Sequence, residues 1–414
     1  MKFLIESKKP AERKNPEETP WGKVFLLVGA GVVASFQIGK VPPVLPGIRI
    51  DLQMSLFLVS WVLAIFNLTG LFLGPVAGAL ADRLGHRRLL LWGLVIQAGG
   101  SFIGAMSGSP ALLLGTRVLE GLGFLIIATS APSLIFKIVR PNQIRVALGI
   151  WSAFVPIGMT LVMVGSPLIV GLSGWRGLWQ ANALILLGYA LVLMNRTRDL
   201  TRTAGGTKTG WRLILEDVWK TATAPGPAVL ALIFSTYALE WVTVMGFFPT
   251  LLMENRGFQA GSSSLLTAVM VAVNIPGNFM GGWLLQRGWR RWRIIAFSSL
   301  IMAVGSLVIF NPGFPFALQY LSCLIFSGVG GMIPAAVFGG VPVFAPSRKL
   351  VATTNGLIIQ GSQLGQVIGP PLLAWTVSAT GTWQAAPWLL VTSAFLGTSL
   401  SLVLAVLEKK SRPD

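Results

Sequence analysis

Four charged residues lie inside long apolar runs of this chain, where their side chains could do chemistry: Lys40, Arg117, Glu120 and Glu240. A charged side chain in the middle of a bilayer costs roughly 2.5–3.5 kcal/mol, so each of them should face a cavity or a partner. Lys40 and Arg117 could bind an anion, because their positive charges would be neutralised by it in a medium of low dielectric constant. Glu120 and Glu240 could each take up and release a proton.

The same four residues also have structural interpretations. Arg117 and Glu120 are three positions apart on one helix face, so they could form an ion pair that only fixes helix packing. Lys40 comes just before three prolines that should bend or unwind its helix, and its side chain could extend to the outer membrane surface. Glu240 could form a salt bridge with Lys40. If Glu240 has no partner, burial favours its protonated form, and it is then the first choice for proton coupling.

Uncharged side chains in the same apolar runs could complete a binding site. Tyr237 and Trp241 lie beside Glu240, and Trp151 is another aromatic residue deep in a run. Gln363 and Gln366 are three positions apart on a glycine-rich run and could both face a pathway. Packing between helices is the alternative for all of them. We expect a substrate site formed by Lys40, Arg117, Tyr237, Trp241, Gln363 and Gln366.

Cysteine and histidine are too scarce for most catalytic or metal sites. Cys323 is the one cysteine and His86 the one histidine, which excludes an intrachain disulfide and leaves almost nothing for a metal site or a catalytic triad. The chain also lacks a nucleotide-binding motif. The sequence therefore predicts no cofactor, no metal ion and no enzymatic activity, and no cytoplasmic segment is long enough for the output domain of a receptor.

The composition predicts a membrane protein. Of 414 residues, 53% are hydrophobic and 11% charged, with a mean hydropathy of +0.72, whereas soluble domains carry about 25% charged residues. Apolar runs of about 20 residues, the length that spans a bilayer, recur along the whole chain. We predict twelve membrane-spanning helices, at 23–46, 55–79, 88–107, 109–137, 146–172, 176–195, 226–252, 261–285, 293–311, 315–339, 350–377 and 384–406.

These helices form two homologous halves in an all-α membrane protein. Gly121 and Gly123 in the fourth run recur as Gly328 and Gly330 in the tenth, the corresponding run of the second half. Such parallel repeats place a substrate site between the halves, near the middle of the membrane. The predicted parts are a tail (1–21), a six-helix bundle (22–195), a linker (196–223), a second six-helix bundle (224–407) and a second tail (408–414).

The cations show the expected orientation. Of the 32 Lys and Arg residues, 27 fall in the tails and in alternate breaks between runs, whereas the opposite breaks hold only Arg49, Arg176 and Arg256. Cytoplasmic loops carry such an excess of positive charge, so both termini and the linker should be cytoplasmic in an inner-membrane protein. The net charge of +18 thus reflects topology, and we expect lipid rather than nucleic acid as the large partner.

Two motifs resemble those of a known family. Gly78-x-Leu80-x-Asp82-Arg83-x-Gly85-x-Arg87-Arg88 resembles the loop 2–3 motif of the major facilitator superfamily, and Arg117-x-x-x-Gly121-x-Gly123 resembles its helix-four motif. The stretch around Lys40 and the Arg117 motif are similar to the cyanate/nitroimidazole permease-type branch. The resemblance implies a monomer with twelve helices, in which two halves rock around a central site.

The resemblance also implies a conformational latch on the cytoplasmic side. Its residues are Gly78, Asp82, Arg83, Gly85, Arg87 and Arg88, with Gln286 and Arg287 in the second copy. Because Gln286 stands where the first copy has an acid, the latch should be asymmetric. Small residues allow close helix packing, and we expect this role for Gly121, Gly123, Gly356, Gly365 and Gly369.

The sequence therefore predicts a secondary active transporter that moves a small anionic solute by alternating access, coupled to protons through Glu240 or Glu120. The alternative is proton-coupled efflux of lipophilic or cationic drugs, in which these two carboxylates would act as counter-charges. The two readings differ in which charges matter: anion transport should depend on Lys40 and Arg117, and drug efflux on Glu240.

Overall fold

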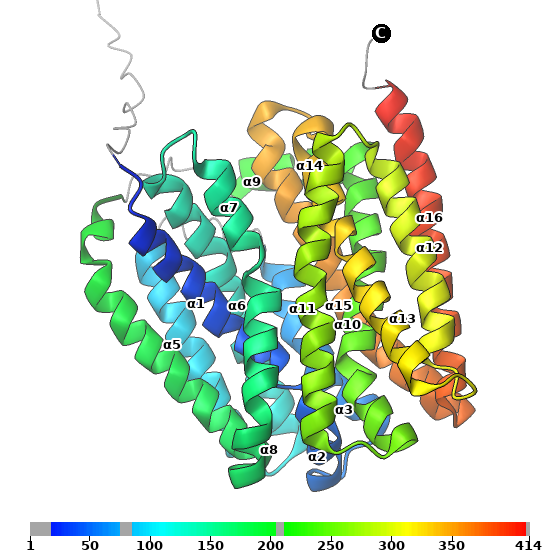
Figure 1. Cartoon of the computed structure of the whole chain (residues 1–414). Helices are drawn as coiled ribbons and strands as arrows, with labels where there is room; N and C mark the ends of the chain where they lie inside the picture. Colours follow the sequence, from blue (N-terminus) through cyan, green and yellow to red (C-terminus); the bar gives the residue numbers. More distant parts are fainter. Residues whose placement is uncertain (1–17, 75–84, 204–210, 411–414) are drawn as a thin grey trace, which may run out of the picture.

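The computed structural model describes residues 18–74, 85–203 and 211–410, and within these ranges the chain is built from helices (Figure 1). Long helices run side by side and form two bundles, with most of the first half of the chain at the left of Figure 1 and the second half at the right. Gly78, Asp82 and Arg83 of the predicted latch lie outside the described residues, as do most of the N-terminal tail and the last four residues.

The N-terminal half runs from α1 to α8. Its elements are α1 (Trp21–Gly39), η1 (Pro42–Val44), α2 (Leu45–Asp51), α3 (Leu56–Ala64), η2 (Ile65–Asn67) with helix continuing over 68–74, α5 (His86–Ala105), α6 (Pro110–Ile138), α7 (Ile144–Ser152) and α8 (Phe154–Arg196). Helix α1 ends at Gly39 because two prolines follow, which hold Pro42–Val44 in a short 3₁₀ turn.

The linker and the C-terminal half complete the chain. The linker holds η3 (Arg198–Thr203) and α9 (Trp211–Ala222). The C-terminal half consists of α10 (Pro225–Arg256), α11 (Ala260–Gln286), α12 (Arg291–Ile309), α13 (Phe316–Gly330), α14 (Met332–Phe344), η4 (Arg348–Leu350), α15 (Val351–Thr380), η5 (Trp383–Ala385) and α16 (Ala386–Lys410).

The helices agree with the twelve predicted spans. Ten stretches of the described chain are long and apolar enough to cross a membrane. One of them, Val146–Arg196, contains two predicted spans, and Gly174 separates them with φ 63° and ψ −168°, a conformation that favours glycine. The remaining predicted span is α15, whose glycines and glutamines lower its hydropathy.

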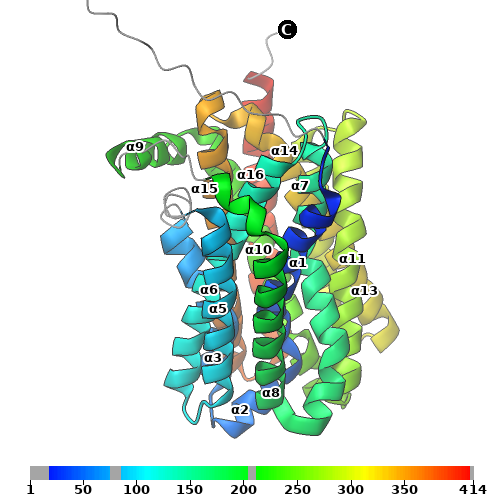
Figure 2. The ribbon, with the colours of Figure 1, turned by 90° about the vertical axis from the view of Figure 1, so that its left-hand side faces the viewer.

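Each half is held together by its own helix pairs. Helix α1 packs on α8 and α5 on α6 in the first half, and α10 packs on α15 and α12 on α16 in the second. The halves meet along α8 and α11 and along α3 and α15; Figure 1 shows α8 and α11 in the centre, and Figure 2 shows the first half from its outer side.

Four of the five glycines predicted to pack do lie against neighbouring helices. A Cβ atom at Gly121 or at Gly365 would lie 2.0 Å from a backbone oxygen of the next helix, at Phe66 and Ser235 respectively. Gly123 and Gly369 have neighbours at 2.5 and 2.4 Å. Gly356 differs, because no atom lies within 4 Å of its Cβ position and it faces a cavity instead.

Candidate functional site

A cavity of about 2000 Å³ lies between the two halves. It is lined mainly by α6, by the start of α8, and by α10, α11, α14 and α15. Its lining includes Lys137 at the end of α6, Asp217 on α9 and Gln286 at the end of α11, which belong to the end of the bundle that carries α7, α9 and both chain termini (Figure 1). We call this the open end of the molecule.

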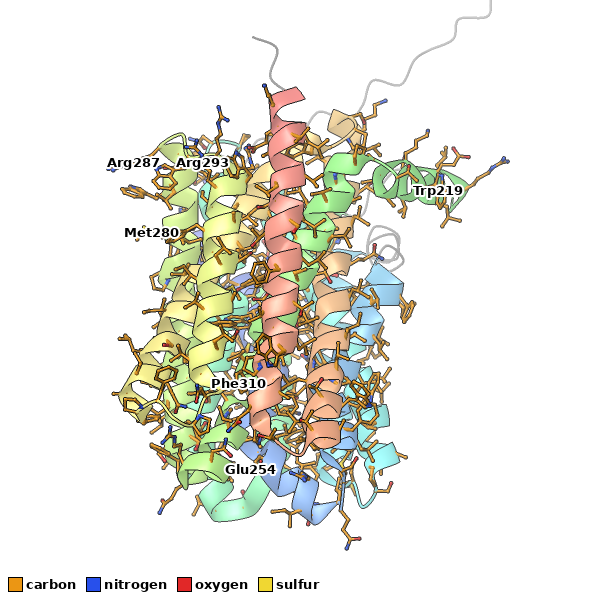
Figure 3. All side chains as sticks on the ribbon, turned by 90° about the vertical axis from the view of Figure 1, so that its right-hand side faces the viewer. Trp219, Glu254, Met280, Arg287, Arg293 and Phe310 are labelled. Atoms are coloured by element: carbon orange, nitrogen blue, oxygen red, sulfur yellow. The ribbon has the colours of Figure 1, made fainter. Side chains whose placement is uncertain are left out.

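The opposite end is closed by contacts between the halves. The hydroxyls of Ser166 on α8 and Ser264 on α11 lie 2.9 Å apart. An ion pair joins Arg49 Nη1 on α2 to Glu254 Oε1 on α10 at 3.2 Å, and the indole of Trp383 donates to the other oxygen of Glu254 at 3.0 Å. Figure 3 shows Glu254 at this closed end. The cavity is therefore accessible from one end of the bundle in this conformation.

Aromatic rings form both walls of the cavity. On the first half, Trp151 and Phe154 are stacked with centroids 4.2 Å apart. On the second half, Phe234 is stacked with Tyr237 at 5.9 Å, and Trp241 lies one turn further along α10. All five line the cavity. Such walls favour flat, apolar or aromatic groups of a ligand.

Amide side chains supply the polar groups in the deep part of the cavity. Asn274 Nδ2 donates to the hydroxyl of Tyr237 at 3.0 Å, and Gln366 Nε2 donates to Ser362 Oγ at 3.1 Å. The Oε1 atom of Gln363 is buried and finds no hydrogen-bond partner among the described residues. Since a buried polar atom without a partner is unfavourable, Gln363 is ready to accept a hydrogen bond from a ligand or water.

Lys40, Arg117 and Glu120 lie together, but inside the N-terminal half. Lys40 Nζ lies 2.7 Å from Glu120 Oε1, and Arg117 Nη1 is paired with Glu120 Oε2. The ammonium of Lys40 also donates to Ser101 Oγ at 2.8 Å and lies 4.0 Å from the ring centroid of Trp179. These three charged side chains are at most 1% exposed, and none of them occurs among the described residues that line the cavity.

Arg117 satisfies backbone groups that two interrupted helices leave free. Its Nε donates to the carbonyl of Val62 at 2.9 Å, and its Nη1 donates to that of Gln37 at 2.8 Å. The carbonyl of Val62 lies just before the 3₁₀ turn of η2, and that of Gln37 just before the end of α1. Carbonyls at helix ends lack intrahelical partners. This geometry matches the structural alternative for Arg117 and Glu120.

Two further alternatives for Lys40 are wrong in this structure. Its side chain does not extend to the outer surface, because it is completely buried. It forms no salt bridge with Glu240, because its partner is Glu120. The sequence correctly predicted that Lys40 lies near a broken helix. It could not show that the side chain of Lys40 points into the N-terminal bundle.

Glu240 also lies behind the cavity wall. It is 2% exposed, its neighbours Tyr237 and Trp241 line the cavity while it does not, and the hydroxyl of Ser393 on α16 is next to its carboxyl. Its Oε2 atom has no hydrogen-bond partner among the described residues. Glu240 is thus a carboxyl enclosed by its own half and has no counter-ion among the ion pairs of the described chain.

The described part of the predicted latch is not joined across the halves. Gly85 has φ 91° and precedes α5. Arg87 donates to the carbonyl of Met194 at 2.8 Å, within its own half, and Arg88 is exposed. In the second copy Gln286 lines the cavity, and the guanidinium of Arg287 lies 3.8 Å from the ring centroid of Trp283.

Comparisons with known proteins agree with this architecture. The family model described as Major Facilitator Superfamily matches residues 27–359 and, in a second overlapping match, 230–414. A candidate niacin/nicotinamide transporter named NiaP from Bacillus subtilis (strain 168) is 22% identical over 366 residues, which cover 86% of this chain and 88% of that protein. The methylenomycin A resistance protein of the same organism is 23% identical over 87% of this chain and 89% of its own length.

A solved structure has the same fold. It is a bacterial homologue of the human lysosomal transporter Spinster, in an inward-facing and unoccupied conformation, with a TM-score of 0.82 and 16% identity. The superposition covers 96% of this chain and 99% of that chain.

Proposed function

Because the chain belongs to the Major Facilitator Superfamily and is a membrane transporter, we propose that it transports a small planar organic solute by alternating access. The solute binds in the cavity between the two halves. The observation that carries this proposal is the character of the cavity. Stacked rings line both of its walls, and amides supply the polar groups of its deep part. The charged side chains among its described lining residues, Lys137 and Asp217, lie near the open end.

This environment favours an uncharged ligand with hydrogen-bonding groups at its edge. Burying an ion without a partner is costly, whereas a neutral amide or heterocycle loses little when amides replace its water. Flat rings gain roughly 0.5–1.5 kcal/mol from a stacked or edge-on aromatic partner beyond the area they bury. Gln363, whose buried Oε1 atom has no hydrogen-bond partner in the described part of the chain, would accept a hydrogen bond from an N–H or O–H of such a ligand.

An anionic solute, as expected from the sequence, is the second candidate. The observation that favours it is the net charge of the buried cluster, where Lys40 and Arg117 face the single carboxylate of Glu120. The cluster lies behind the cavity wall at Ile38, so its field would reach an anion in the cavity without direct contact. Efflux of cationic drugs would use Glu120 and Glu240 as counter-charges, but neither residue lines the cavity in this conformation.

We place the open end on the cytoplasmic side. The helix ends there carry a series of cations, among them Arg140, Arg196, Arg212, Arg290 and Arg293, and cytoplasmic loops are rich in Lys and Arg. With that orientation the cavity faces inward and both termini are cytoplasmic. The rocking motion would open the contact between Arg49 and Glu254 and close the end that carries α7 and α9.

Proton coupling is proposed for Glu240. It is a buried carboxyl without a counter-ion among the described residues. It can therefore change between a neutral form and a charged form, and the two conformations can stabilise these forms differently. Its position on α10, behind Tyr237 and Trp241, lets a change of charge act on the helix that forms the cavity wall. Glu120, in contrast, is already the counter-ion of two cations.

The test uses matched pairs of a neutral amide and its carboxylate: nicotinamide with nicotinate, and benzamide with benzoate. Thermal stabilisation of the purified protein is measured for each compound, since a ligand stabilises the state it binds. We expect stabilisation by at least one amide, reduced in Gln363→Leu and retained in Gln384→Leu, an exposed glutamine outside the cavity lining. Stabilisation by the carboxylates alone would favour the anionic candidate, and no response to any of the four would contradict the proposed ligand class.

A further inference from the structure

Helix α9, between the two halves, presents an apolar face that no described part of the protein covers. Successive residues of a helix are about 100° apart, so Leu215 and Trp219 lie about 40° apart on one side. Leu215 is 67% exposed and Trp219 72% exposed. Arg212 and Glu216 form an exposed ion pair at 3.5 Å and flank this face, at about 60° and 100° around the helix from Leu215.

The helix lies across the end of the bundle rather than along it. Figures 2 and 3 show α9 projecting sideways beyond the long helices, and Figure 3 shows Trp219 on the projecting part. It packs on α10 and α15, and the buried Thr221 and the cavity-lining Asp217 belong to its attached side. Its position is therefore fixed by the bundle, while Leu215 and Trp219 point away from the described part of the protein.

The level of α9 matches the membrane surface marked by other residues. Figure 3 places Trp219 near the level of Arg287 and Arg293 on the other side of the bundle. There Arg287 stacks on Trp283, and Trp283 and Trp289 are 45% and 53% exposed. Exposed tryptophans beside cations mark the boundary between lipid tails and headgroups. An amphipathic helix at this boundary buries its apolar face among the upper parts of the acyl chains.

We propose that α9 is a membrane-surface helix, and that its partner is the lipid leaflet at the open end, into which Leu215 and Trp219 insert. The charges of Arg212, Glu216, Asp217 and Lys220 balance, so insertion depends on apolar contact and not on anionic headgroups. Through Asp217 and Val218, which line the cavity, this contact connects the mouth of the cavity to the leaflet.

Two leucines of α9 provide a matched test. Leu213 and Leu215 are both exposed, but they point about 200° apart around the helix. A polarity-sensitive fluorophore is attached to Leu213→Cys or to Leu215→Cys in full-length protein that carries Cys323→Ala, reconstituted in phosphatidylcholine nanodiscs. Quenching is measured with doxyl-labelled lipids and with aqueous iodide.

We expect the label at 215 to be quenched several-fold more strongly by doxyl lipid than the label at 213, and the label at 213 to be quenched more strongly by iodide. The same pattern should appear when phosphatidylglycerol is added to the lipid. Equal iodide quenching of both labels would overturn the proposal. So would a label at 215 that neither quencher reaches, because protein would then cover this face.

Discussion

Lys40 Nζ and Glu120 Oε1 lie 2.7 Å apart and completely buried, although 80 positions of sequence separate the two residues. With Arg117 they join α1 to α6 inside the N-terminal half. The charges that first suggested a substrate site thus stabilise the arrangement of broken helices behind the cavity wall. The cavity itself presents rings and amides.

Glu120→Gln should destabilise the N-terminal half. The substitution leaves Lys40 and Arg117 buried without a counter-charge, and breaking a buried ion pair in this way costs about 3–5 kcal/mol. The melting temperature of the purified protein should fall clearly, whereas Glu216→Gln, which removes a carboxylate from the exposed face of α9, should leave it nearly unchanged. An unchanged melting temperature in Glu120→Gln would show that the cluster does not hold the fold.

Gly365→Ala should disturb the contact between α10 and α15. A Cβ at this position would lie 2.0 Å from the carbonyl oxygen of Ser235, which is backbone and cannot move alone. Overpacking of this kind costs typically about 1–3 kcal/mol. Gly356→Ala on the same helix is the control, since no atom lies within 4 Å of its Cβ position. Equal melting temperatures of the two variants would argue against tight packing at Gly365.

Glu240→Gln should separate transport from proton coupling. The amide has nearly the same shape and cannot ionise, so folding should be retained and a pH gradient should no longer drive accumulation. Exchange of labelled for unlabelled solute across proteoliposomes needs no gradient and should continue. Accumulation that still follows the pH gradient in this variant would assign coupling to another group.

Glu254→Gln should weaken the closed end. The pair of Arg49 and Glu254 is 38% exposed on both sides, and exposed pairs contribute about 0.2–1 kcal/mol, which corresponds to a change of roughly 1.5- to 5-fold in the ratio of two conformations. Spin labels on α2 and α10 at this end should report a larger population of long distances. Lys220→Gln, at the other end of the molecule, should leave the distribution as it is.

Hydropathy and turn residues were enough to predict the helices, because a membrane span is a property of about 20 consecutive residues. The cavity-lining Tyr237, Trp241, Gln363 and Gln366 could be named because they are unusual in apolar runs. Which face of a helix points to the cavity was not predictable, since it depends on packing between distant helices. For this reason Lys40 and Arg117 lie elsewhere than expected.

The contact between Arg49 and Glu254 shows the same limit. Both residues stand at the ends of apolar runs and belong to different halves. Nothing in the local sequence pairs them, and only the closure of one end of the cavity brings them together. The aromatic pair of Trp151 and Phe154 depends similarly on the turn between α7 and α8.

Accessibility of the deep cavity from each side of the membrane tests alternating access most directly. Gln366→Cys is introduced together with Cys323→Ala, and a charged, membrane-impermeant thiol reagent is added to one face of vesicles of known orientation. We predict modification from the side of α9, and modification from the opposite side that rises when Glu254→Gln is also present. Reaction from the side of α9 only, with no trace from the opposite side in either protein, would contradict the account.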